Sequence, residues 1–242
     1  MKDQYVGDIG DYTKLALLRV LENAGFSIGV NWYLTDDDLN SKDGRHIEYL
    51  CAPCDTPDQE LYNTLYDIVK VKKMRSIDAL MESNLLHTRL FYKSKLEFSA
   101  YENRSGKRVE WHNQAITSLQ SADIVFLDPD NGLTPDGVGP YARKRNKYVT
   151  YEEVAEYYNS GKTVIVYSHR DRSPIEKYLE RLCRFSKDGT VAKGSLLCLY
   201  ASRYSPRDYL FLMQQRPQEK IVSALNDMLK TCWNKYLKCR EL

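Results

Sequence analysis

The chain has 242 residues, of which 43% are hydrophobic and 28% are charged, and its formal net charge at pH 7 is +2. This composition is typical of a globular protein and excludes a disordered or fibrous chain. The sequence also contains no run of the roughly 20 apolar residues needed to cross a bilayer. The N-terminal residues also lack the apolar core of a secretory signal, so we expect one cytoplasmic domain over residues 1–242.

The first part of the chain alternates helical spacing of apolar residues with short apolar runs. The expected elements are a helix capped by Asp11 and ending near Gly25, a strand over 27–34, helices over 60–71 and 76–86, and a weak strand near 89–92. The first strand is followed by three consecutive aspartates and a polar loop that reaches Gly44.

The second part continues this alternation and contains the clearest strand of the sequence. The expected elements are a helix over 107–119, a strand over 123–128, a loop over 129–147, a helix capped by Thr150, a strand over 163–167, a helix near 174, strands over 195–200 and 209–213, and a helix over 218–236. Alternation of this kind predicts a Rossmann-like three-layer α/β domain with a mostly parallel sheet and an antiparallel C-terminal edge.

Polar side chains follow three of the predicted strands, at the edge where open α/β sheets bind their ligands. They are Asp36 to Asp38 after the first strand, Asp128, Asp130 and Asn131 after the central strand, and His169 after the next one. Pro129 prevents the strand from continuing just after Asp128. We therefore expect Asp128, Asp130, Asn131 and His169 to be catalytic. The alternative is a strand-terminating turn in which Asp128 caps backbone amides.

Two further segments are candidates for binding. Residues 7–14 combine two glycines with Asp8, Asp11 and Lys14, so the segment is either an entrance loop over a ligand or an ordinary turn and helix cap. A basic cluster soon after the Asp128 motif suggests contact with phosphates, although it is equally compatible with a solvated loop; its residues are Arg143, Lys144, Arg145 and Lys147.

The six cysteines form no disulfide pattern. Cys51 and Cys54 have CxxC spacing, but no second ligand pair of the kind that completes a zinc site follows them.

With its elements in this order, the chain resembles class I S-adenosylmethionine-dependent methyltransferases. It looks closest to the bacterial large-subunit ribosomal RNA N6-adenine methyltransferases, and it also resembles uncharacterised bacterial proteins that share the segments GDIGD and FLDPDNGL. The similar segments are residues 10–15, residues 32–36 with Gly44, Asp128-Pro129-Asp130-Asn131, and Tyr167 with Asp171-Arg172. The resemblance implies that S-adenosylmethionine is bound by Asp8, Asp11, Lys14, Asp36, Asp38 and Gly44, and that RNA or DNA is the substrate.

Two features depart from that family. An acidic loop with only Gly44 replaces the glycine-rich cofactor loop, and Asp130-Asn131 replaces the catalytic Pro-Tyr that stacks on a flipped base. Three hypotheses therefore stay open. The chain is a nucleic-acid methyltransferase, or a metal-dependent nuclease or phosphodiesterase that holds Mg²⁺ on Asp36, Asp128 and Asp130, or a non-catalytic module that senses a ligand or binds a partner.

Overall fold

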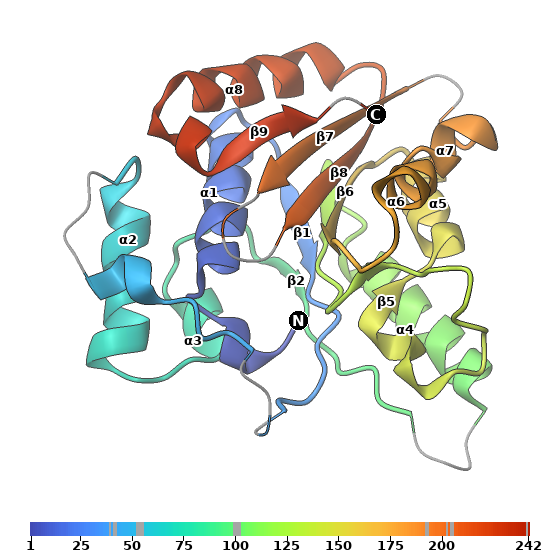
Figure 1. The fold of residues 1–242 in the computed structure, drawn as a ribbon, viewed down its shortest axis with the longest axis horizontal. Helices are drawn as coiled ribbons and strands as arrows, with labels where there is room; N and C mark the ends of the chain where they lie inside the picture. The colour runs from blue at the N-terminus through green and yellow to red at the C-terminus, as the bar shows by residue number, and fades with distance from the viewer. Residues whose placement is uncertain are drawn as a thin grey trace.

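The computed structural model describes residues 1–38, 40, 43–51, 56–98, 103–191, 194–201, 203, 206–240 and 242. A seven-stranded sheet of order β2-β1-β3-β6-β8-β7-β9 runs through its centre (Figure 1). The parallel strands are β2 (Leu90–Tyr92), β1 (Ile28–Asn31), β3 (Ile124–Leu127) and β6 (Thr163–His169). The strands β8 (Arg207–Met213), β7 (Ser195–Ala201) and β9 (Leu237–Arg240) follow, each antiparallel to the strand before it. This arrangement confirms the predicted Rossmann-like fold with an antiparallel C-terminal edge.

Helices cover both faces of the sheet (Figure 1). One face carries α1 (Ile9–Asn23), α2 (Gln59–Tyr66), α3 (Ile77–Glu82) and α8 (Gln218–Lys230). The other face carries α4 (Arg104–Ser118), α5 (Tyr151–Asn159), α6 (Ile175–Leu182) and α7 (Arg184–Lys187). Successive residues of a strand point to opposite faces, so Ile124 and Phe126 of β3 join the first apolar core and Val125 and Leu127 join the second.

The first helix begins earlier than the sequence predicts, and the prediction that Asp11 caps it was wrong. Asp8 is the cap, because its Oδ1 accepts a hydrogen bond from the Asp11 amide at 2.9 Å. Asp11 lies inside the first turn, where its carboxylate accepts from the Gly7 amide at 3.1 Å. This shift buries the Asp11 side chain at the sheet edge instead of leaving it at the helix entrance.

The predicted loop over 129–147 is more ordered than expected. It contains β4 (Gly132–Leu133) and a short 3-10 helix, η4 (Arg143–Lys147), and β4 pairs in parallel with β5 (Tyr148–Val149). The capping box at Thr150 is confirmed at the start of α5. The predicted strand over 163–167 extends two residues further, so His169 is the last residue of β6.

The single helix predicted over 218–236 was wrong. Helix α8 ends at Lys230, because Thr231 adopts extended backbone angles and its hydroxyl accepts from the Trp233 amide. A short 3-10 helix, η5 (Cys232–Lys235), and the unpredicted strand β9 follow. Two further short helices are η1 (Asp3–Tyr5) and η2 (Glu48–Cys51), and a π-helical turn, η3 (Asp67–Val71), extends α2. Within the part that the structure describes, no helix is both long enough and apolar enough to span a membrane.

Candidate active site

Charged side chains and one imidazole form a largely buried cluster where the N-terminus of α1 meets the carboxyl ends of β3 and β6. We call it the buried charged cluster, and its members are Asp8, Asp11, Lys14, Asp128, Asp130, His169 and Arg207. The cavity between them has a volume of about 10 Å³, which is about the room that one water molecule needs. In this conformation the cluster therefore admits no ligand larger than water.

Lys14 lies between two carboxylates at the centre of this cluster. Its Nζ is 2.7 Å from Asp11 Oδ1 and 2.7 Å from Asp128 Oδ2, and all three side chains are at most 2% exposed. The ammonium also lies over the Tyr167 ring, 4.8 Å from its centroid. Burial alone would lower the pKa of Lys14, but the two carboxylates outweigh it and raise the pKa well above the ordinary value. Lys14 is thus a fixed positive charge.

The two aspartates of the central motif have different surroundings. Burial raises the pKa of Asp128 despite the nearby Lys14, and the Asp128 carbonyl accepts from the amino group of Met1 at 3.1 Å. Burial also acts on Asp130, but the positive charges of that amino group, Lys2 and Lys147 outweigh it and lower the pKa of Asp130.

Asp130 is also the carboxylate with hydrogen-bonding capacity to spare. Its Oδ2 lies 3.4 Å from Lys147 Nζ and 3.9 Å from Lys2 Nζ. Its Oδ1 is buried and has no hydrogen-bond partner among the described residues. An unpaired buried acceptor is costly, so Asp130 Oδ1 is the atom of the motif best placed to accept a hydrogen bond from a ligand.

His169 is a neutral imidazole at physiological pH. Burial and the positive charge of Arg207 lower the pKa of His169 to about 3, and its ring packs edge-on against Tyr167. With so low a pKa it is a poor proton acceptor, but it can still donate or accept a hydrogen bond.

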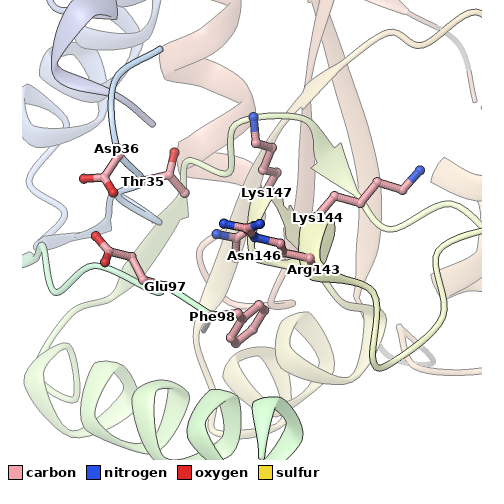
Figure 2. A pocket seen from close by; sticks show the side chains of 8 residues that line it. All are labelled: Thr35, Asp36, Glu97, Phe98, Arg143, Lys144, Asn146 and Lys147. Carbon is pink, nitrogen blue, oxygen red and sulfur yellow. The ribbon is translucent and has the colours of Figure 1, made fainter. Parts of the chain in front are cut away.

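An open pocket of about 420 Å³ lies at the carboxyl ends of β1 and β2. We call it the β1–β2 pocket; Thr35, Asp36, Glu97, Phe98, Arg143, Lys144, Asn146 and Lys147 line it. Figure 2 shows the carboxylates of Asp36 and Glu97 on one side and the side chains of Arg143, Asn146 and Lys147 opposite them. Lys147 connects this pocket to the buried charged cluster, because its Nζ is the one that approaches Asp130.

The predicted site residues therefore divide between the two sites. The β1–β2 pocket brings together Asp36 with Arg143, Lys144 and Lys147, which the sequence assigns to the cofactor and to nucleic acid respectively. The buried charged cluster brings together Asp8, Asp11 and Lys14 with Asp128, Asp130 and His169.

Four predicted residues line neither site. Asp38 lies in the exposed loop after β1, where its amide donates to Gln4 Oε1. Asn131 lines a separate pocket beside β6. Arg145 donates to the Val138 carbonyl. Gly44 has a φ of +68°, and a Cβ there would lie 1.9 Å from the Gln4 carbonyl oxygen, so its conformation accommodates the N-terminal segment.

Several residues that shape these sites went unpredicted. Glu97 and Phe98 follow β2, and an acid and an aromatic after a strand would have been a usable signal had that strand been clearer in the sequence. Lys2, Tyr5 and Arg207 enter the cluster from the N-terminal segment and from β8, and no local pattern marks them.

The structure describes only one cysteine of the CxxC pair. Cys51 is an exposed free thiol, and Cys54 lies outside the described residues. Among the residues that the structure describes, no group of three or more His, Cys, Asp or Glu side chains is arranged to hold a metal ion.

Neither protein-family models, nor curated proteins, nor solved structures give a match to this chain.

Proposed function

We propose that this chain is a methyltransferase-like enzyme that binds S-adenosylmethionine in the β1–β2 pocket and acts on nucleic acid. The observation that carries the proposal is the lining of this pocket, where Asp36 and Glu97 present two carboxylates beside the Phe98 ring at the ends of adjacent parallel strands. Its volume of about 420 Å³ falls within the usual range of small-molecule sites.

The residues present fit the parts of S-adenosylmethionine. Carboxylates such as Asp36 and Glu97 accept hydrogen bonds from ribose hydroxyls. The Phe98 ring, 7% exposed and packed in the second apolar core, gives the pocket an apolar wall for adenine. Arg143 and Lys147 supply positive charge for the carboxylate of the methionine portion. Side chains would thus bind the cofactor here, whereas backbone amides bind it in a glycine-rich loop.

S-adenosylmethionine supplies an electrophilic methyl group when it is bound. The role we assign to Asp130 is to accept a hydrogen bond from the target amine, because its Oδ1 is the buried acceptor without a partner. Asp128, held by Lys14, keeps the motif in place. Lys147 lines the pocket and approaches Asp130 at 3.4 Å, so movement of its partly exposed side chain would open a path from the pocket to Asp130.

The position of Lys14 disfavours the metal-dependent alternative. Its ammonium lies 2.7 Å from both Asp11 and Asp128, so Asp128, one of the three carboxylates that the metal hypothesis uses, already has a cationic partner. Asp36 lies in the other site, where Lys95 is its ion-pair partner.

Isothermal titration with S-adenosylmethionine tests the proposal. We expect micromolar binding by the wild-type protein and at least tenfold weaker binding by Asp36→Asn and Glu97→Gln. A matched control is Glu82→Gln, which removes the same charge from an exposed position at the end of α3 and should bind as the wild type does.

Transfer of labelled methyl groups from S-adenosylmethionine to RNA or DNA then tests catalysis, with Asp130→Asn expected to lose activity while it retains binding. Absence of binding up to millimolar concentration would refute the proposal. Binding without transfer to any nucleic acid would instead support the ligand-sensing hypothesis.

A further inference from the structure

A second pocket lies at the carboxyl end of β6, on the opposite side of the Asp128 motif from the β1–β2 pocket. We call it the β6 pocket. It has a volume of about 300 Å³ and is lined by Asn131, Leu133, Tyr148, Ser168, His169, Arg170, Asp171, Arg172, Tyr178, Arg181 and Leu182. His169 also borders the cavity of the buried charged cluster, so the two pockets flank that cluster from either side.

The charge of the β6 pocket is positive and mostly uncompensated. Of its three arginines, Arg181 is paired with Asp171 at 2.6 Å. Among the described residues, neither Arg170 nor Arg172 forms an ion pair with a side chain, although both line the pocket. Two guanidinium groups are thus available to an anion, and guanidinium binds phosphate with paired, directional hydrogen bonds.

The buried side of the pocket is polar. Tyr178 is 2% exposed, and its Oη makes no hydrogen bond of normal length but lies close to the Ser168 hydroxyl and the Asp208 carboxylate. Ser168, equally buried, lies in the same lining. Because buried polar groups are costly to leave facing an apolar surface, this polar floor favours a polar ligand over an apolar one.

The basic lining continues beyond this pocket. Arg181 also lines an adjoining hollow of about 590 Å³, where it joins three further basic residues and two acidic ones, Lys177, Arg184, Lys187, Asp136 and Glu180. A ligand with a single anionic group would need only the first pocket. A chain of phosphates could follow the basic surface from one hollow into the next, as nucleic acid strands do along positively charged grooves.

Residues 147 and 148 connect the two pockets. Lys147 lines the β1–β2 pocket, whereas Tyr148, the next residue, lines the β6 pocket beside Asn131. Tyr148 thereby offers an aromatic ring within the basic pocket, and base stacking on such rings contributes to binding of single strands.

We propose that the β6 pocket binds one phosphate-bearing nucleotide unit of a single nucleic acid strand, with Arg170 and Arg172 on the phosphate and Tyr148 beside the base. This inference rests on the proposed function. It assigns binding of the nucleic acid substrate to residues other than the basic cluster that the sequence suggested. The donor and the acceptor of the transferred group would then approach the Asp128 motif from opposite sides.

The test uses a fluorescein-labelled single-stranded RNA of ten nucleotides and measures its anisotropy at several salt concentrations. The variant Arg170→Gln/Arg172→Gln should bind the RNA at least tenfold more weakly. The slope of log Kd against log salt concentration should also decrease by about 1.4, because two phosphate contacts are lost. The control is Arg216→Gln/Lys220→Gln, which removes two exposed positive charges that follow β8, at the end of the strands away from the β6 pocket.

Titration with S-adenosylmethionine separates this inference from the proposed function. If the β6 variant binds S-adenosylmethionine like the wild type but has lost RNA affinity, the inference is supported. If RNA binding depends on Arg170 and Arg172 while no form of the protein binds S-adenosylmethionine, the proposed cofactor is refuted and the RNA site stands. Equal losses in the β6 variant and the control, or no RNA binding by the wild type, would overturn the inference.

Discussion

Replacement of Lys14 by methionine tests whether its ammonium holds the buried charged cluster together. Methionine keeps the length and most of the volume of the side chain but removes the charge, so Asp11 and Asp128 would lose their partner. Both ion pairs measure 2.7 Å, and all three side chains are at most 2% exposed, so water cannot replace the ammonium without rearrangement. Removing one partner of a buried pair typically costs about 3–5 kcal/mol, and we expect a loss of that size.

Urea unfolding of the wild type and of Lys14→Met measures this loss. The control is Lys230→Met, since Lys230 pairs with Asp227 at 2.8 Å but the two side chains are 75% and 69% exposed. The pair distances are nearly equal, so the comparison isolates burial, and exposed pairs contribute about 1 kcal/mol at most. A loss in Lys14→Met no larger than that in the control would refute the reasoning.

The pH dependence of the loss provides a second check. Burial already raises the folded-state pKa of Asp128, and removal of Lys14 would raise it further. A carboxyl group with a raised pKa binds a proton more readily in the folded state than in the unfolded state, so its stability contribution grows as pH falls toward the unfolded pKa. The deficit of Lys14→Met should therefore shrink between pH 8 and pH 5.

Two further predictions concern His169 at the end of β6 and Gly132 in β4. Burial lowers the pKa of His169 to about 3, so as pH falls the unfolded chain takes up a proton at this residue before the folded chain does. The free energy of unfolding of the wild type should therefore fall by up to about 1.4 kcal/mol per pH unit between pH 6.5 and pH 3. His169→Gln should show a shallower decline in the same urea series. Gly132→Ala should destabilise the protein by about 2–4 kcal/mol, since the residue has a φ of +97° and a Cβ would lie 2.3 Å from Ser168 Oγ. The control is Gly161→Ala, where φ is +86° but a Cβ would meet nothing within 4 Å, so it should lose only the stability that the positive φ costs. Equal losses in both variants would contradict the steric argument.

The regular part of the fold was predictable because local patterns specify it. The four parallel strands each contain a short apolar run, and Thr150 with Glu153 forms the capping box that the sequence indicates. Boundaries failed where two local signals competed. Asp8 and Asp11 can both cap a helix, and only packing at the sheet edge decides that Asp8 does so while Asp11 pairs with Lys14.

The candidate site was predictable as a region but not as a set of contacts. The rule that polar strand ends converge placed Asp128, Asp130 and His169 at one edge, and the structure brings them together. It could not show that Asp36 belongs to a different pocket, because β1 ends at Asn31 and the chain then carries Asp36 to its partner Lys95. Arg207 enters from an antiparallel strand near the C-terminus, and such long-range partners leave no trace in local spacing.

The segment 143–148 serves both pockets, and a buried ion pair beneath it determines its position. Arg108 of α4 donates to the carbonyl oxygens of Arg145 and Tyr148, each at 2.7 Å, and to the Glu153 carboxylate of α5 at 2.6 and 2.8 Å. A buried ion pair is weak evidence for stability by itself, but a planar guanidinium that satisfies two carbonyls and a carboxylate at once fixes one geometry. The backbone between the pockets is therefore held in place before any ligand binds, which lowers the ordering cost of binding. The Lys147 side chain, 38% exposed and 3.4 Å from Asp130, is then the contact between a ligand in the β1–β2 pocket and the buried charged cluster.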